Sequence, residues 1–246
     1  MTAVLVIAGT DSSGGAGLAR DVATLTCLGV EAQCAVTAVT AQTEREVTAV
    51  ELLPPHLVQA QIDAALATGR VAAIKIGMLG ASAIVEAVAE SIPPRARLPL
   101  VLDPVLAATS GGALLDAAGR AALVARLLPR TTLLTPNIPE AAALLEATPA
   151  TSAAEVIEQG RALCARGAAA VLMKGGHASG ERATDWLVTA EGRVHELGAP
   201  RLTGARRGTG CALASAIAAG LAAGVTLELA CRRAKEHVTG LLQQSA

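Results

Sequence analysis

Aromatic side chains are almost absent from this sequence. It contains no Phe and no Tyr, and Trp186 is its single Trp. Proteins that hold single-stranded nucleic acid stack bases on aromatic rings, and such platforms are missing here. The 20 Lys and Arg residues are balanced by 21 Asp and Glu residues, which gives a net charge of −1 and no general basic field. These features argue against nucleic acid as a partner.

Paired cysteines and membrane-length apolar runs are also lacking. The five cysteines are scattered, odd in number and form no CxxC pair, which favours a reduced protein without a zinc site. The N-terminal residues carry no basic segment before their apolar run, so they predict a buried strand and not a signal peptide. The longest apolar runs are interrupted by Gly and are too short to span a membrane. We therefore expect a cytoplasmic protein without a membrane partner.

The sequence does provide ample material for a core, with 52% hydrophobic and 17% charged residues over 246 positions. Strand-like runs alternate with helical ones, and no linker or repeat divides the chain. This pattern predicts a single α/β domain over residues 1–246, with a doubly wound, mainly parallel sheet, helices on both faces and a small antiparallel hairpin at one edge. The expected strands span residues 3–8, 31–39, 71–76, 98–102, 132–134, 169–173, 182–188 and 193–198. The expected helices span about 17–28, 55–68, 81–90, 116–128, 138–146, 151–166 and 226–243, with a further helix after Gly210.

The segment Gly208-Thr209-Gly210-Cys211 precedes a helix-forming run of small apolar residues. Glycines let several backbone N–H groups turn toward one point, and a helix that begins there adds unpaired N–H groups and the positive end of its dipole. The segment therefore predicts an anion hole, suited to phosphate or to charge that develops in a transition state. Cys211 falls in the first turn, where the dipole would lower its pKa. Alternatively, the segment is a plain turn before a buried helix, with Cys211 in the core.

Unusual residues follow one expected strand after another. Open α/β sheets bind ligands beyond the carboxyl ends of their strands, so this distribution predicts a site there. The loop of residues 9–17 after the first strand is rich in Gly and hydroxyls, but its spacing fits neither a dinucleotide fingerprint nor a P-loop. The other clusters contain Gln42, Gly77-Met78, Asp103, Asn137-Ile138-Pro139-Glu140 and Lys174.

These side chains together suit phosphoryl transfer, which depends on positioning, a metal and charge stabilisation. Asp103 and Glu140 offer carboxylates for Mg²⁺, directly or through water. Asn137 and Lys174 can bind phosphate oxygens. Each residue also has a purely structural alternative: Asn137 as a helix cap, Glu140 as a solvated first-turn carboxylate, Asp103 as the start of a turn and Lys174 as a surface residue.

Seven motifs occur in order along residues 3–240, and together they resemble the hydroxymethylpyrimidine/phosphomethylpyrimidine kinases, a branch of the ribokinase-like superfamily. The motifs are Ala8-Gly9-Thr10-Asp11 with Gly14-Gly15-Ala16-Gly17 and Asp21; Thr40-Ala41-Gln42; Lys75-Ile76-Gly77-Met78-Leu79; Asp103-Pro104-Val105 with Thr109-Ser110-Gly111; Thr135-Pro136-Asn137 with Pro139-Glu140-Ala141; Lys174-Gly175-Gly176-His177; and Gly208-Thr209-Gly210-Cys211. The resemblance implies phosphorylation of 4-amino-5-hydroxymethyl-2-methylpyrimidine, and then of its monophosphate, for thiamine biosynthesis. It also implies ATP and Mg²⁺ as cofactors.

The resemblance further implies a role for each matching residue. Gln42 would bond the pyrimidine edge, and Cys211 would stand at the position of the catalytic base, beside the anion hole of Gly208, Thr209 and Gly210. Thr209 would also contact the nucleotide. The residues expected around the pyrimidine ring are Gly9, Ala16, Asp21, Met78 and Val105. The residues expected to serve the nucleotide and its magnesium are Asp103, Asn137, Glu140 and Lys174.

A cysteine at the base position suggests a hypothesis about the two reactions. A thiolate could take the proton of the first acceptor, an alcohol, while a neutral thiol would not repel the second acceptor, a phosphate. On this hypothesis, Cys211→Ser slows the first phosphorylation more than the second.

Two features depart from the family pattern. The family usually has Asn-Thr-His before its GTGC, where this chain has Ala205-Arg206-Arg207, and this chain lacks the common Gly-rich tail. The two arginines could grip phosphates or be solvated. The alternative functions are a pyridoxal or pyridoxine kinase and a non-catalytic regulator that binds a nucleotide or pyrimidine. Relatives are often dimers, which makes a homodimer a further expectation.

Overall fold

The first strand shows why the centre of the sheet is apolar without interruption. β1 (Ala3–Ala8) is completely buried. Successive side chains of a strand point to opposite faces. Leu5 and Ile7 accordingly join one hydrophobic cluster, and Val4 and Val6 join another on the opposite face. A strand covered by helices on both sides needs apolar residues at every position.

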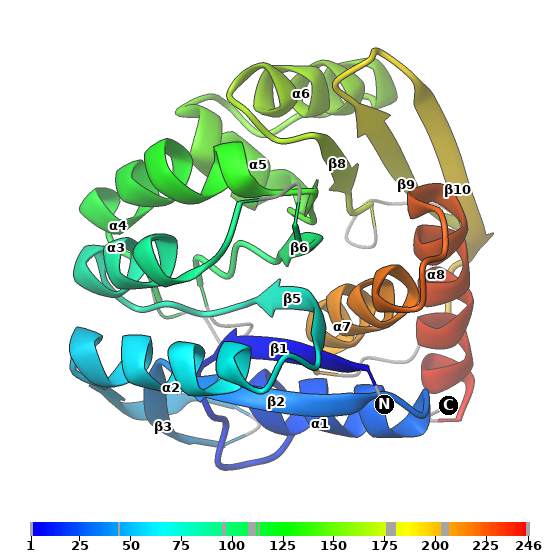
Figure 1. Ribbon diagram of the computed structural model, residues 1–246. Helices are drawn as coiled ribbons and strands as arrows, with labels where there is room; N and C mark the ends of the chain where they lie inside the picture. Colours follow the sequence, from blue (N-terminus) through cyan, green and yellow to red (C-terminus); the bar gives the residue numbers. More distant parts are fainter. Residues whose placement is uncertain are drawn as a thin grey trace.

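The computed structural model describes residues 2–43, 45–94, 97–107, 112, 114–175, 181–202 and 207–244. Within these residues, eight strands form a sheet in the order β10-β9-β8-β7-β6-β5-β1-β2 (Figure 1). Strands β2, β1, β5, β6, β7 and β8 pair in parallel, whereas β9 and β10 pair antiparallel at one edge. The other strands of this sheet are β2 (Glu31–Val36), β5 (Val71–Ile76), β6 (Leu100–Leu102), β7 (Leu133–Leu134), β8 (Ala170–Met173), β9 (Arg182–Thr189) and β10 (Val194–Pro200). The predicted fold class and edge hairpin are confirmed.

Helices cover both faces of the sheet (Figure 1). One face packs against α1 (Gly17–Cys27), α7 (Thr209–Ala222) and α8 (Leu227–Gln243). The other face packs against α2 (Pro55–Ala67), α3 (Ser82–Ser91), α4 (Ala117–Ala122), α5 (Ile138–Leu145) and α6 (Ala153–Ala165). The helix expected over 116–128 is regular only in α4, because the chain continues as a π-helical turn (Leu123–Leu127) and a 3-10 turn (Leu128–Arg130).

The strand expected over residues 31–39 is wrong in its second half. The main-sheet strand β2 ends at Val36, and the buried Thr37 donates its hydroxyl to the Met78 carbonyl at 2.7 Å. The chain then forms β3 (Ala38–Gln42), which pairs antiparallel with β4 (Val47–Leu52) in a separate two-stranded sheet. This second hairpin carries Gln42 at the end of its first strand.

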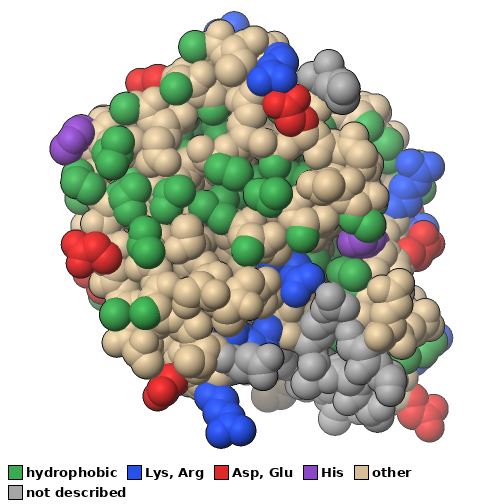
Figure 2. Space-filling view, turned by 90° about the horizontal axis from the view of Figure 1, so that it is seen from below, with side chains coloured by type: hydrophobic (Ala, Val, Ile, Leu, Met, Phe, Trp, Pro, Cys, Tyr) green, Lys and Arg blue, Asp and Glu red, His purple; other side chains and the backbone are tan. Residues whose placement is uncertain are grey.

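Several large apolar side chains remain exposed on the two-stranded sheet and its surroundings. Val39 is 52% exposed, Val50 41% and Leu52 37%. Figure 2 shows hydrophobic side chains gathered in a band on the face seen from below, the side on which β3 lies in Figure 1. Among the described helices, none is both long and apolar enough to cross a membrane.

Candidate active site

Lys174 joins two carboxylates at the carboxyl end of the sheet. Its Nζ lies 2.9 Å from Asp103 Oδ1 and 3.7 Å from Glu140 Oε2. Asp103 follows β6, Glu140 lies in the first turn of α5 after β7, and Lys174 follows β8, so three neighbouring strands bring these groups together. Burial alone would lower the pKa of Lys174, but the carboxylates of Asp103 and Glu140 raise it above its ordinary value. Lys174 is therefore a fixed, largely buried cation and not a surface residue.

Asn137 and Glu140 form a reciprocal cap at the start of α5. The Asn137 Oδ1 accepts from the Glu140 backbone N–H at 2.7 Å, and Glu140 Oε2 accepts from the Asn137 N–H at 2.7 Å. The capping role expected for Asn137 is confirmed, whereas its contact with phosphate stays a prediction. Burial raises the pKa of the Glu140 carboxyl above its ordinary value despite the nearby Lys174. Glu140 is thus a half-buried carboxylate and not a solvated one.

The N-terminus of α7 lies against these charges. Gly208 precedes the helix with a φ of +74°, and a Cβ there would overlap the Gly15 carbonyl oxygen, so only glycine suits the position. At Gly210 a Cβ would lie 3.4 Å from Lys174 Nζ and 3.7 Å from Asp103 Oδ2. The unpaired N–H groups of the first turn of α7 therefore lie beside the ammonium of Lys174. The helix terminus and the ammonium together make this point positive, and the binding of phosphate there stays a prediction.

Cys211 lies where two helix N-termini meet. The backbone N–H of Gly17, the first residue of α1, lies close enough to the Cys211 sulfur to act on the pKa of its thiol. Burial raises the pKa of the Cys211 thiol to about 11, although the ammonium of Lys75 and the Gly17 N–H act to lower it. The expected lowering by the helix dipole is therefore wrong in direction, because loss of solvent outweighs the nearby positive groups. Cys211 is a neutral thiol at physiological pH.

A buried ion pair lies beneath this thiol. Lys75 Nζ and Asp21 Oδ2 are 2.7 Å apart with side chains 1% and 0% exposed, and Ser215 donates to Asp21 Oδ1 at 2.7 Å. Burial alone would lower the pKa of Lys75, but the Asp21 carboxylate raises it. The carboxylate of Asp21 is thus fully buried and bonded to Lys75 and Ser215. In this arrangement it supports the site from below instead of contacting a ring, which is the contact that the resemblance implied. Sequence reasoning assigned no role to Lys75, although a lysine in an otherwise apolar strand was the available signal.

The residues expected around a ring come from the loop after β1 and from the ends of β3, β5 and β6. A Cβ at Gly9 would lie 3.0 Å from Met78 Sδ, so the ends of β1 and β5 meet there. Ala16 caps α1 and lies beside Gly208, and Gln42 is half-exposed at the end of β3. Val105 is half-buried next to Asp103. Three segments, the loop of residues 9–17, the end of β3 and the residues after β5, therefore bring Gly9, Ala16, Gln42 and Met78 near one another. Their contact with a substrate ring stays a prediction.

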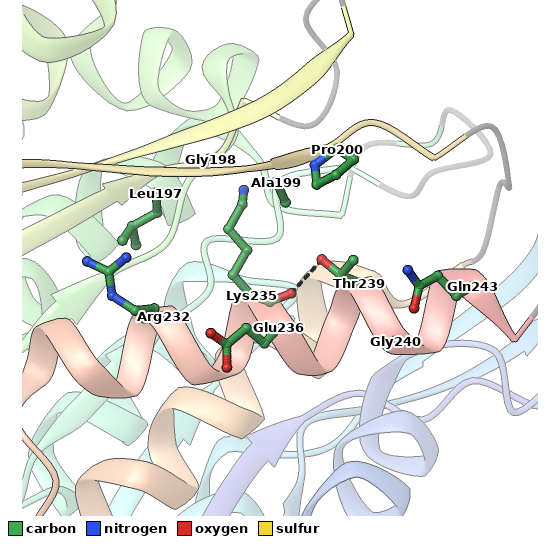
Figure 3. Close-up of a pocket in the computed structure, with 10 residues that line it drawn as sticks. All are labelled: Leu197, Gly198, Ala199, Pro200, Arg232, Lys235, Glu236, Thr239, Gly240 and Gln243. Atoms are coloured by element: carbon green, nitrogen blue, oxygen red, sulfur yellow. Dashed lines mark hydrogen bonds between the residues drawn. The ribbon is translucent and has the colours of Figure 1, made fainter.

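A pocket of about 350 Å³ opens between β10 and α8 (Figure 3). Leu197, Ala199 and Pro200 form one wall, and helix α8 forms the other with the Lys235 and Thr239 side chains. Lys235 Nζ lies 2.6 Å from Asp185 Oδ2, and Asp185 Oδ1 accepts from the Gly175 N–H at 2.9 Å. Because Gly175 follows Lys174, these contacts connect the pocket to the charged site. Sequence reasoning missed this pocket, since its residues show no distinctive spacing.

Some predicted positions lie outside the described residues. They are Thr109, Ser110, Gly111, Gly176, His177, Ala205 and Arg206.

Comparison with known proteins agrees with this geometry. A family model described as phosphomethylpyrimidine kinase matches residues 11–246. The hydroxymethylpyrimidine/phosphomethylpyrimidine kinase of Escherichia coli (strain K12) is 48% identical over 216 residues, which cover 87% of this chain and 81% of the relative.

Solved structures of two vitamin kinases have similar folds. A phosphomethylpyrimidine kinase from Clostridium difficile 630 superposes with a TM-score of 0.84 at 33% identity, over 98% of this chain and 99% of that one. The pyridoxal kinase of Staphylococcus aureus in complex with pyridoxal gives a TM-score of 0.89 at 29% identity, over 99% of this chain and 88% of that one. From the family match and these identities, the chain belongs to the phosphomethylpyrimidine kinase family.

Proposed function

We propose that this phosphotransferase uses ATP to phosphorylate 4-amino-5-hydroxymethyl-2-methylpyrimidine and then the resulting monophosphate, in thiamine biosynthesis. The observation that carries the proposal is the position of Lys174, which is held by Asp103 and Glu140 directly beside Gly210 at the N-terminus of α7. This arrangement places two kinds of positive group around one point, as the transfer of a phosphoryl group requires. The acceptor would lie on the side of Gly9, Ala16, Gln42 and Met78, with Val105 nearby, and the nucleotide on the side of Lys174.

In this mechanism the chain positions charge and leaves little covalent chemistry to its own side chains. The N–H groups at Thr209 and Gly210 would bind oxygens of the transferred phosphoryl group, and Lys174 would neutralise charge that develops during transfer. Asn137 would face the nucleotide from the start of α5. Cys211 would face the acceptor hydroxyl as a neutral group.

Asp103 and Glu140 fit a magnesium ion that accompanies ATP. Asp103 Oδ1 is occupied by Lys174 and by Thr135, whose hydroxyl donates at 3.2 Å, while no described residue bonds Oδ2, which lies toward Gly210. The described residues contain no group of three or more metal-ligating side chains. The two carboxylates of Asp103 and Glu140 suit Mg²⁺, because this ion keeps several waters and takes further oxygens from substrate phosphates. When bound near Asp103 and Glu140, the ion would supply positive charge that neutralises the phosphates of ATP.

The pocket between β10 and α8 suits the base of the nucleotide. The wall formed by β10 is apolar, the wall formed by α8 carries polar and charged side chains, and the volume of about 350 Å³ is in the range of small-ligand sites. The Lys235–Asp185–Gly175 contacts connect it to the phosphate side of the site. A flat heterocycle could therefore lie against Pro200 and α8 while its phosphates extend toward Lys174.

The test is a mass-resolved assay with ATP, Mg²⁺ and hydroxymethylpyrimidine, with pyridoxal in a parallel reaction. We expect mono- and diphosphorylated pyrimidine. Monophosphate alone would contradict the second step. Phosphorylated pyridoxal alone would replace the proposal with a pyridoxal kinase, which the similarity to the Staphylococcus aureus enzyme makes the second candidate. No product from either compound would favour a non-catalytic binding protein.

Two glycine substitutions should distinguish the contribution of the turn of residues 208–210 to stability from its contribution to catalysis. Gly208→Ala forces a Cβ onto the Gly15 carbonyl at a φ of +74°, so we expect a lower melting temperature and almost no activity. Gly210→Ala meets Lys174 Nζ only at 3.4 Å, so we expect an unchanged melting temperature but a kcat lowered about tenfold or more, because the methyl group occupies space beside the phosphate donors. Thermal unfolding and steady-state rates of both variants check this. Full activity of Gly210→Ala would show that phosphate does not bind there.

The two-stranded sheet supports a homodimer as the form of the enzyme. Among the described strands none pairs with the outer edge of β4, and apolar side chains are exposed on both faces of the sheet, Val39 on one and Val50 on the other. A second copy could pair with this edge and cover these residues. Light scattering of the eluted protein should give twice the mass of 24.5 kDa, and Val50→Lys should give monomers. A monomeric wild-type protein would contradict the proposal.

A further inference from the structure

Arg207, which immediately precedes Gly208, contacts two segments that are distant from it in the sequence. Its Nη1 donates to Ser13 Oγ at 3.2 Å and to the Thr43 carbonyl oxygen at 2.7 Å. Its Nη2 donates to Asp11 Oδ2 at 3.3 Å. The side chain is only 17% exposed. One guanidinium thus joins the loop after β1, the turn after β3 and the start of α7.

The partner carboxylate, Asp11, organises the loop that Arg207 holds. Asp11 Oδ1 accepts from the Ser13 N–H at 2.9 Å, and Oδ2 accepts from the Ala16 N–H at 2.9 Å. The Asp11 side chain is only 3% exposed, so without Arg207 it would keep a buried negative charge with no ion-pair partner among the described residues. We therefore expect the loop around Ala16 to depend on Arg207.

The turn after β3 is held to the same loop through Gln42. The Gln42 N–H donates to Ser12 Oγ at 2.8 Å, and Ser12 Oγ donates to the Gln42 carbonyl at 2.9 Å. Arg207 adds its bond at the next residue, Thr43. Gln42 and Ala16, both expected at the acceptor, are therefore set at a fixed spacing relative to α7 by contacts that converge on Arg207.

We propose that Arg207 is a positioning residue for the acceptor: its guanidinium holds the loop around Ala16, the end of β3 at Gln42 and the N-terminus of α7 in one arrangement. This inference rests on the proposed function for the identity of the acceptor. A histidine ring, which has at most two N–H donors, cannot donate to Asp11, Ser13 and Thr43 together, so the role requires arginine. Asp11 already forms an ion pair with Arg207, so the guanidinium has less positive charge available to bind a phosphate. This distinguishes the positioning role from phosphate binding. The Nε–H is buried and has no partner among the described residues, so a contact from Nε to the acceptor phosphate is the rival role.

Steady-state kinetics with each acceptor separately distinguish the two roles. For Arg207→Ala we expect KM to rise about tenfold for both the alcohol and its monophosphate, which is the scale of one or two lost hydrogen bonds to a charged group. KM for ATP should change less than about twofold, because among the described residues the hydrogen bonds of the Arg207 side chain go to Ser13, Thr43 and Asp11 and not to Asn137 or Lys174. Arg207→Lys should remain impaired, since an ammonium cannot reproduce the planar fork. Arg70→Ala, which removes an exposed arginine paired with Glu31, serves as the control and should match the wild type.

A rise in KM for the monophosphate alone would assign Arg207 to the acceptor phosphate and overturn the proposal. An equal rise in KM for ATP and for both acceptors, or no change in any KM, would also overturn the proposal.

Hydrogen exchange of the free protein tests the same inference without substrate. In Arg207→Ala the amides of Ser13 and Ala16, which donate to Asp11, should exchange faster, while those of α8 should not change. Unchanged protection at Ser13 and Ala16 would contradict the positioning role even if the enzyme is active. If the wild type fails to phosphorylate the pyrimidine, the proposed function falls, and the exchange result still decides what Arg207 holds.

Discussion

Replacement of Lys174 by methionine is expected to lower kcat by about 10²- to 10³-fold, the range found when one preorganised donor is removed from an active site. Lys174 is held by Asp103 at 2.9 Å and approaches Glu140 at 3.7 Å, and it lies beside the N-terminus of α7. Methionine retains most of the side-chain volume but removes the charge. The two carboxylates would then lie close to the transferred phosphate without a cation between them.

The kinetic pattern is as informative as the size of the loss. Lys174→Met should lower kcat more than it raises KM for ATP, because the ammonium stabilises charge that develops during transfer. Thr239→Leu, which fills part of the pocket between β10 and α8, should do the opposite and raise KM for ATP with little effect on kcat. Circular dichroism at the assay temperature should show both variants folded. A Lys174→Met enzyme with normal kcat would remove Lys174 from the mechanism.

Much of the fold could be predicted because local patterns and packing agree. The uninterrupted apolar run of β1 and the capping sequence from Asn137 to Glu140 have the same meaning in isolation as in the folded chain. The course of the chain after Val36 could not be predicted in this way. Where the chain leaves the main sheet, the hydroxyl of Thr37 donates to the Met78 carbonyl, and such a contact between residues 41 positions apart leaves no local signal in the sequence.

In the site, too, some features follow from the local sequence and others depend on contacts between distant residues. Its location at the carboxyl ends of the strands was predictable, since residue types alone placed Asp103, Glu140 and Lys174 there. The charge state and the ion-pair partner of each side chain were not predictable, because they depend on which groups are buried together. Asp21 is neutralised by Lys75 below the site, and the thiol of Cys211 loses more from burial than it gains from its positive neighbours.

Replacement of Cys211 by aspartate should separate the two phosphorylations. We expect the second to slow by about 10²-fold, because unit charges 4 Å apart repel by about 1 kcal/mol in water and about 4 kcal/mol near a protein surface. The first acceptor is a neutral alcohol, so it meets no such repulsion from a carboxylate. Rates measured separately with the alcohol and the monophosphate as acceptors check this split.

Cys211→Ser is the neutral control. A hydroxyl adds no charge, so we expect it to spare the second phosphorylation. It should slow the first more, because a serine hydroxyl is a weaker acid than a cysteine thiol and therefore supplies even less of the ionised form that could take the proton of the alcohol. With a thiol pKa of about 11, the resting enzyme keeps Cys211 neutral at physiological pH, which suits a site that must admit both an alcohol and a phosphate. Equal losses of both steps in Cys211→Asp would mean that the side chain does not face the acceptor. Equal losses in Cys211→Ser would remove any separate role for the thiol in the first step.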